Sequence, residues 1–449
     1  MCNELDQALK QLAEEFAVSK EDVQTAAFCF QEHMKRGLQG KESSLKMLPS
    51  YLQGPGGGEK GVFLALDFGG SNARAAVIEL QGNGVFREAH KVSRPLFDAA
   101  SGRDYRAAET TAEELFDFLA GLIEETLREA DFIKKEINGS NAVLPLGFTF
   151  SFFYRQKSLK EGILAEWNKE VKTSGVEGRD VARLLTAALN RRGLDGVVKS
   201  SAVLNDSTAN YLTAAYQDPY VTAATILGTG HNTCYLESSA PGFAGPVIIN
   251  TETGNFSAVP ETGYDRVLDE ESDNPGEQYL EKRVSAKYLG ELFRLIMADF
   301  SRRKLFRGLN PLPGPANWNV PYSLSGKDMA DLCFGPDLFL CCVAEAERRA
   351  LPAIAGVLLK RSARLAAAGL LGVVRHIDPE GTQRQTVAVD GSLYAEMPGY
   401  ARELSAALEE GLGPKAGLIK VNLSSGGSLV GAGIAAALAG EAERKGIMG

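Results

Sequence analysis

The sequence predicts an α/β protein of two domains, and three observations support this prediction. The chain has 449 residues, which is more than one hydrophobic core of ordinary size accommodates. Strand-like and helix-like segments are mixed along it, as in layered α/β proteins. Finally, two strand–glycine turn–strand units occur, in Leu64–Leu80 and again in Thr225–Leu236. Their likeness favours a duplicated fold whose halves face each other, over two ordinary hairpins that are alike by coincidence.

The first unit has the features of a phosphate-binding turn. Two glycines beside a serine and an asparagine allow a sharp turn and expose backbone N–H groups, and a concave row of N–H groups binds an anion. An aspartate at the strand end could hold a metal ion through water, and an arginine could neutralise phosphate. A plain glycine-rich hairpin would use similar residues. The candidate phosphate-binding residues here are Asp67, Gly69, Gly70, Ser71, Asn72 and Arg74.

The second unit repeats this order with different residues. An apolar strand leads into Gly228–Thr229–Gly230, and Asn232 follows before the next strand. If the fold is duplicated, the two turns could bind one polyphosphate from opposite sides.

Helical periodicity and turn residues place the other elements. The segment 4–36 is helical by pattern, and Ser19 with Asp22 resembles a helix start. A glycine- and proline-rich loop at 53–58 precedes the first strand. The elements expected next are a helix at 111–130, a strand at 144–150, an amphipathic helix at 178–192 and a strand at 197–204.

The second half is expected to be richer in helix. Pro275–Gly276 introduces a long helix that reaches about Phe300, and helices dominate 327–375. A strand at 385–389 is followed by a turn at 390–392. The segment Ser424–Ser428 opens an alanine-rich helix at 430–445. A glycine- and serine-rich turn at a helix start favours a phosphate or nucleoside site, with an ordinary loop and N-cap as the alternative.

Composition excludes several classes of protein. The net charge of −9 and the isoelectric point of about 5.3 argue against nucleic acid or an anionic membrane as partner. No apolar run reaches the roughly 18 residues of a membrane span, and the first residues show no signal-peptide pattern. Six cysteines without a CxxC pair and four histidines argue against a zinc site and favour a reducing cytoplasm. No Walker A or dinucleotide-binding glycine motif occurs.

Polar residues gather at the ends of apolar strands, where α/β proteins bind ligands. Asparagine amides and carboxylates can hydrogen-bond several sugar hydroxyls at once. A carboxylate such as Asp206 can also take the proton from a hydroxyl that attacks phosphorus. Each residue alone is typical of a solvated surface or a turn. The set comprises Ser151, Asn168, Lys169, Asn205, Asp206, Asn232, Glu252, Gln278 and Glu281.

With these residues in place, the chain resembles the hexokinase family, in its eukaryotic-type group that includes glucokinase. The resemblance runs through nearly the whole length, as many separate motifs in the same order, and the length corresponds to a single catalytic unit. The matching segments are Met34–Leu38, Met47–Pro49, Leu64–Arg74, Pro145–Ser151, Gly162–Leu164, Ser174–Gly178, Asn205–Asp206, Gly228–Asn232, Asn250–Glu252, Asn274–Lys282, Val389–Tyr394 and Leu423–Ala432.

The resemblance implies an actin-like ATPase fold of two ribonuclease H-like domains with an interdomain cleft. The small domain would comprise 65–204 and 431–449, and the large domain 1–64 and 205–430. The implied reaction transfers the γ-phosphoryl group of ATP, with Mg²⁺, to the 6-hydroxyl of a hexose, most simply D-glucose in the first step of glycolysis. Asp206 would be the catalytic base and Lys169 a second catalytic group, while the polar set above would line the sugar. The two glycine turns, Asp67–Arg74 and Gly228–Gly230, would be the phosphate-binding loops, and Gly427 and Ser428 would lie near the adenosine.

The chain departs from the family pattern around the expected sugar site. Ser71 replaces the usual threonine, Phe153 a proline and Asn168 a threonine. Glu170 and Val171 replace a Gly–Phe pair, Thr253 replaces an aromatic residue, and the segment 252–266 is shortened. These changes bear on which hexose is preferred. A catalytically weak sugar sensor and another actin-fold ATPase remain alternatives, and a monomer and a homodimer are both open.

Overall fold

The computed structural model describes residues 2–130, 143–167, 171–306, 318–335, 344–424 and 427–446. The chain forms two compact units. One comprises Met1–Met47, Thr225–Thr233 and Thr251–Leu423, and the other Leu48–Ala224, Cys234–Asn250 and Ser424–Gly449. We call them the first and the second unit. The domain boundaries expected from the sequence stay a prediction.

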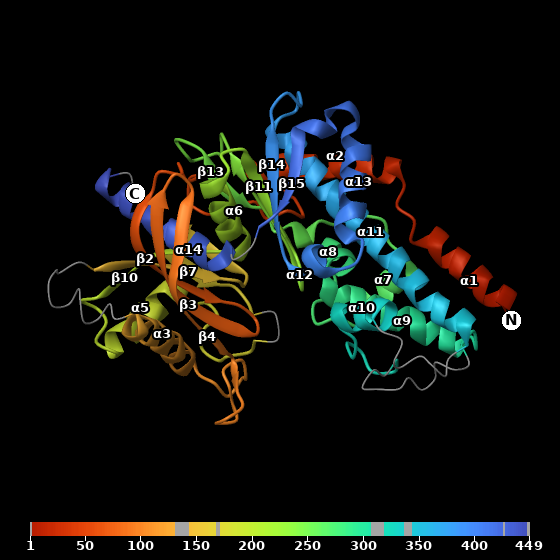
Figure 1. Cartoon of the computed structure of the whole chain (residues 1–449), viewed down its shortest axis with the longest axis horizontal. Helices are drawn as coiled ribbons and strands as arrows, with labels where there is room; N and C mark the ends of the chain where they lie inside the picture. Colours follow the sequence, from red (N-terminus) through yellow and green to blue (C-terminus); the bar gives the residue numbers. More distant parts are fainter. Residues whose placement is uncertain are drawn as a thin grey trace. The chain divides into compact units, whose positions relative to one another are not determined.

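A five-stranded mixed sheet organises the second unit (Figure 1). Its strand order is β10-β7-β2-β3-β4, with β10, β7 and β2 parallel and β3 and β4 added as antiparallel neighbours. The sheet therefore has three parallel strands whose carboxyl ends share one edge. The strand bounds are β2 Lys60–Phe68, β3 Asn72–Gly82, β4 Val85–Pro95, β7 Leu144–Phe150 and β10 Val198–Leu204.

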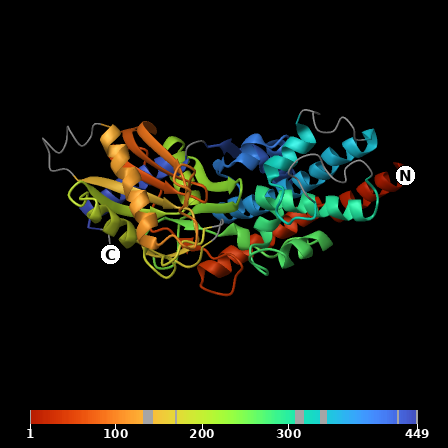
Figure 2. The same ribbon diagram turned by 90° about the horizontal axis from the view of Figure 1, so that it is seen from below.

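Helices cover both faces of this sheet, which explains why its central strands read as unbroken apolar runs. On β2, Leu64 and Leu66 pack into the core with α3 and α5. Alternate residues face the other way, and a Cβ on Gly147 of β7 would lie 1.9 Å from the carbonyl oxygen of Ala432 in α14. Figure 2 gives a second view, in which the orange helix α3 lies across the strands. The helices here are α3 Ala112–Glu129, α5 Val181–Arg191, α6 Asp206–Gln217 and α14 Gly427–Arg444.

A second sheet has the order β1-β13-β12-β11-β14-β15. Apart from β1 at its edge, this order matches the first sheet strand for strand, since β14 and β15 are parallel like β7 and β10, and β12 and β13 are antiparallel like β3 and β4. The duplication predicted from the two glycine turns is thus confirmed. The strands are β1 Leu48–Pro49, β11 Val221–Leu227, β12 His231–Glu237, β13 Val247–Asn250, β14 Gln385–Asp390 and β15 Ile419–Leu423, and the small pairs are β5 Phe97–Asp98 with β6 Arg103–Asp104 and β8 Tyr154–Ser158 with β9 Glu161–Leu164.

Helices build most of the first unit, around the 33-residue helix α11. It packs against α1, α2, α8, α9, α10 and α13. No helix among the described residues is both long and apolar enough to cross a membrane. The helix bounds are α1 Cys2–Glu15, α2 Lys20–Leu38, α7 Gly263–Glu270, α8 Tyr279–Val284, α9 Ala286–Arg302, α10 Gly326–Phe334, α11 Glu345–Ile377, α12 Ser392–Glu396 and α13 Tyr400–Leu412, with 3-10 turns η1 Thr253–Asn255 and η3 Gly413–Leu418.

One helix prediction is confirmed and another needs correction. The segment 4–36 is helical, and the helix start predicted at Ser19 and Asp22 is a complete capping box that begins α2 after α1 has ended. The long helix expected from Pro275 is instead two helices, α8 and α9. Ser285 between α8 and α9 is extended, with φ −75° and ψ 153°, and the first N–H of α9, on Ala286, donates to the Gly228 carbonyl at 2.9 Å. A tertiary contact thus sets where α9 begins.

Candidate functional site

The carboxyl edge of the parallel strands in the second unit collects several predicted site residues. Leu204 of β10 and Asp67 of β2 both pair in register with Thr149 of β7. Asn205 and Ser151 follow directly at this edge, and the Ser151 N–H donates to the Phe68 carbonyl at 3.1 Å. Residues that are far apart in the sequence therefore share one edge, the place where open α/β sheets bind ligands.

Asp206 is the first residue of α6, directly after its N-cap Asn205. The Ser207 N–H donates to Oδ1 of Asp206 at 2.8 Å and to Oδ1 of Asn205 at 3.0 Å. The carboxylate lies at the N-terminal end of the helix, where the helix dipole is positive. Asp206 is half-buried, whereas Asn205 is buried. The strand-to-helix turn thus presents a partly accessible carboxylate held in a defined orientation.

Asp67 and Arg74 face each other across the first glycine turn. They are register partners on β2 and β3, and Arg74 Nη2 donates to Asp67 Oδ2. The same nitrogen lies 3.5 Å from the Ser428 hydroxyl, and Thr149 Oγ1 donates to the Ser428 carbonyl at 2.8 Å. The predicted cofactor residues Asp67, Arg74 and Ser428 are therefore brought together, beside the N-terminal end of α14.

Gly427, also predicted near the cofactor, is packed tightly against α6. A Cβ there would lie 2.8 Å from Asn210 Oδ1, and Thr213 Oγ1 donates to the Gly427 carbonyl at 2.8 Å. The side-chain amide of Asn210 is buried and has no hydrogen-bond partner among the described residues. Asn210 could not be picked out from the sequence, because a mid-helix asparagine carries no signal of the segment that packs on it.

Both glycine turns keep backbone N–H groups available. In the first turn, Gly69 N donates to the Asn72 carbonyl at 3.2 Å, and in the second, Gly228 N donates to the Gly230 carbonyl at 3.1 Å. Within the described part of the chain, no hydrogen bond uses the N–H groups of Gly70 and Ser71, or those of Thr229 and Gly230. Such N–H groups can donate hydrogen bonds to phosphate oxygens.

The predicted sugar residues of the first unit cluster around the second turn. Glu281 Oε2 accepts the His231 N–H at 2.8 Å. Asn232 Oδ1 accepts the Thr253 N–H at 3.3 Å, next to Glu252. A Cβ on Gly254 would lie 3.1 Å from the Cβ of Glu281. This part of the first unit therefore places two carboxylates and an amide close to one glycine turn.

Two of these residues have a strained backbone. Glu252 and Gln278 adopt left-handed conformations, with φ of 54° and 53°. For residues with a side chain this costs about 1–3 kcal/mol each, and such strain tends to collect at ligand sites. Gln278 immediately precedes α8, which carries Glu281. The strain has to be balanced by contacts elsewhere in the segment.

His231 cannot serve as an acid–base group near neutral pH. Its ring is buried, Nδ1 contacts the Ile226 carbonyl at 3.0 Å, and burial lowers the pKa of the imidazole to about 4. The ring is therefore neutral at physiological pH. The predicted residues Asn168 and Lys169 lie outside the described residues.

Known proteins resemble the chain throughout. Two family profiles, both described as hexokinase, match residues 8–216 and 222–438. Hexokinase-1 of Oryza sativa subsp. japonica is 35% identical over 435 residues, covering 90% of this chain and 85% of that protein. Hexokinase-2 of Candida albicans is 31% identical over 435 residues, covering 91% and 86%.

Solved structures agree with these relatives. A crystal structure of a hexokinase matches with a TM-score of 0.81 and 34% identity, covering 97% of this chain and 99% of that one. The hexokinase from Schistosoma mansoni, complexed with glucose, matches with a TM-score of 0.82 and 31% identity over the same shares. Together with the duplicated sheets, these likenesses confirm the actin-like ATPase fold of two α/β domains. The chain belongs to the hexokinase family and is an ATP-dependent sugar kinase, a phosphotransferase.

Proposed function

We propose that this sugar kinase phosphorylates the 6-hydroxyl of a hexose, with D-glucose as the preferred substrate, and so catalyses the first step of glycolysis. The observation that carries the proposal is the cluster of Asn232, Glu252 and Glu281 around the second glycine turn. Carboxylates and an amide held together suit a ligand with several hydroxyls. The Schistosoma mansoni relative complexed with glucose supports the same sugar.

In this proposal Asp206 is the general base. Its carboxylate would accept the proton of the 6-hydroxyl as that oxygen attacks the γ-phosphorus, and ADP would leave with the β–γ bridging oxygen. Support comes from its position at a strand-to-helix turn, oriented by the Ser207 N–H. Lys169 would neutralise charge on the transferred group. Ser151, Asn168, Asn205 and Gln278 would complete the hydrogen bonds to the sugar.

ATP would be bound at the glycine turns and at the start of α14. The free N–H groups of the turns, Arg74 and Ser428 are the groups that support this assignment. The described residues offer no cluster of three or more His, Cys, Asp or Glu side chains to enclose a metal ion. Mg²⁺ would arrive on the ATP phosphates, and Asp67 would contact it through water. The ion would screen the phosphate charge.

Three cysteines in the described part of the chain, Cys29, Cys234 and Cys333, are free thiols. Free thiols are in keeping with a reducing compartment, and we propose the cytoplasm.

Replacing Glu252 or Glu281 by glutamine should weaken sugar binding far more than ATP binding. A hydrogen bond to a charged acceptor contributes about 1.5–3 kcal/mol, so the KM for glucose should rise roughly 10- to 100-fold. Steady-state kinetics with each substrate varied in turn measures both KM values. Glu277→Gln is the matched control, because this exposed glutamate lies in the same segment. Unchanged glucose KM in both site variants would move the sugar site elsewhere.

A further inference from the structure

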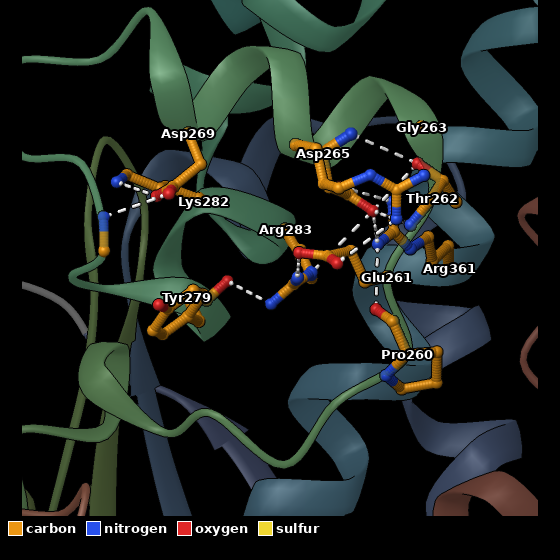
Figure 3. A network of polar contacts seen from close by, with 12 residues as sticks. Pro260, Glu261, Thr262, Gly263, Asp265, Asp269, Tyr279, Lys282, Arg283 and Arg361 are labelled. Carbon is orange, nitrogen blue, oxygen red and sulfur yellow. Dashed lines mark hydrogen bonds and ion pairs between the residues drawn. The ribbon is translucent and has the colours of Figure 1, made fainter.

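Two buried cations stand directly beside a predicted sugar-binding residue. Lys282 and Arg283 follow Glu281 on α8, and only 4% of each side chain is exposed. Lysine and arginine are rarely buried unless a partner compensates their charge. Figure 3 shows both side chains directed at carboxylates of the segment 261–269, on and just before α7. The role of these cations is therefore tied to the α7–α8 segment.

Lys282 and Asp269 close the loop between the two helices. Lys282 Nζ donates to Asp269 Oδ1 at 2.6 Å and to the Asn274 carbonyl at 2.7 Å. The other carboxylate oxygen, Asp269 Oδ2, accepts the Gly276 N–H at 3.0 Å. The Lys282–Asp269 ion pair thus holds the loop through two backbone groups, the Asn274 carbonyl and the Gly276 N–H, just before Gln278. We call these contacts the loop clasp.

Arg283 anchors the opposite side of α8. Its Nη1 donates to the Tyr279 carbonyl at 3.1 Å, and its Nη2 to Glu261 Oε1 at 3.2 Å. Its Nε lies 3.7 Å from Asp265 Oδ2. Asp265 also accepts two hydrogen bonds from Arg361 of α11, at 3.0 and 2.6 Å. Through Asp265 of α7, the short helix α8 is thereby connected to α11 (Figure 3).

Stability alone is a weak reason for a buried ion pair. Removing two charges from water costs about as much as their attraction returns, and well-packed apolar side chains often do as well. Burial lowers the pKa of the Lys282 ammonium, while the hydrogen bond to Asp269 acts against this shift. What an apolar pair would not provide is directional contact with the Asn274 carbonyl and the Gly276 N–H.

The residue that depends most on this geometry is Gln278. It is left-handed, with φ 53°, and its backbone carbonyl accepts the Lys282 N–H at 2.9 Å as the first bond of α8. Three residues later, Glu281 contacts the His231 N–H at 2.8 Å. The loop clasp lies in the chain between α7 and these two residues.

We propose that Lys282, through its ion pair with Asp269, is a positioning residue that sets Gln278 and Glu281 in the arrangement that binds the sugar. Neither Lys282 nor Asp269 needs to touch the substrate. The proposal rests on the sugar site assigned above and deepens it.

Lys282→Met keeps most of the side-chain volume and removes the ammonium group. We expect the KM for glucose to rise about tenfold or more, because small misplacements of positioning groups have large effects. The KM for ATP should change by less than about threefold, since the phosphate-binding turns are untouched. Asp269→Asn should give the same selective change, and the double variant should be no worse than the single ones.

Arg364→Met is the matched control. Arg364 is a largely buried cation of α11 in the same unit, and it pairs with Glu410 of α13, away from the loop clasp. Its loss should lower thermal stability and leave the glucose KM near that of the wild type. Should Lys282→Met fail to fold, Asp269→Asn carries the test, because it replaces a single heavy atom, a carboxylate oxygen, by nitrogen.

An unchanged glucose KM in Lys282→Met and Asp269→Asn would overturn the proposal. Equal increases in the KM values for glucose and ATP would also overturn it, because they indicate general loosening of the fold. Failure of the underlying site assignment is distinguishable: it would appear as an unchanged glucose KM in Glu281→Gln. A selective glucose defect in Lys282→Met together with Glu281→Gln supports both.

Discussion

Replacing Asp206 by asparagine is expected to lower kcat for sugar phosphorylation by about 10²- to 10⁴-fold, the usual contribution of a general base. Asparagine keeps an oxygen that can accept the Ser207 N–H at 2.8 Å, so α6 should start as before. It cannot take the proton from the attacking hydroxyl. A coupled assay for ADP release measures the rate, and Asp206→Ala should be at least as slow.

The control for this change is Asp218→Asn. Asp218 is the C-cap residue of the same helix and accepts the Tyr220 N–H at 2.9 Å. The Asp218→Asn variant should have a kcat close to that of the wild type. A folded Asp206→Asn variant with near-normal kcat would remove Asp206 from the mechanism.

The largest expected effect on stability is that of Asp265→Asn. This carboxylate is buried and bonded to Arg361, with Arg283 close by. Without its charge, two buried guanidinium groups lose a shared partner, and breaking a buried pair typically costs about 3–5 kcal/mol. Urea denaturation of the whole chain measures the change. Asp331→Asn, in an exposed pair with Lys327, should stay close to the wild type, and equal stability of both variants would refute the account.

The Asp265 carboxylate should also make the stability of the fold depend on pH. Burial alone would raise the pKa of Asp265, but the Arg361 and Arg283 charges outweigh it, so the pKa lies below its usual value. A lowered pKa means that the stabilisation is present above the carboxyl pKa of the unfolded chain and is lost as the pH falls through the lower folded value. The stability difference between wild type and Asp265→Asn should therefore shrink in strong acid.

The fold could be predicted from the sequence where the signals are local. The apolar run 144–150 is β7 with the same ends, and the helix expected at 111–130 is α3, which spans Ala112–Glu129. The break at Ser285 could not be predicted, because Val284, Tyr288 and Leu292 continue an apolar helical spacing across it. The contact that ends the pattern is the bond from Ala286 N to the Gly228 carbonyl, between residues distant in sequence.

The candidate site shows the same limit. Asp67, Arg74 and Ser428 could be picked out singly from turn chemistry, and resemblance to a family joined them. Their contacts became evident only from the sheet register and from α14 packed beside it. Lys282 and Asp269 were not picked out at all. A lysine and an aspartate on two helices resemble ordinary surface charges, and only burial and the shared loop reveal what they do.

The most direct test of the account is to identify the products formed from glucose and Mg–ATP by ³¹P NMR. The account predicts ADP and glucose 6-phosphate in equal amounts, formed only when the sugar is present. Mannose, fructose and glucosamine, compared by kcat/KM, should be poorer substrates than glucose. A folded protein that binds glucose yet forms no sugar phosphate, or that hydrolyses ATP without it, would contradict the account.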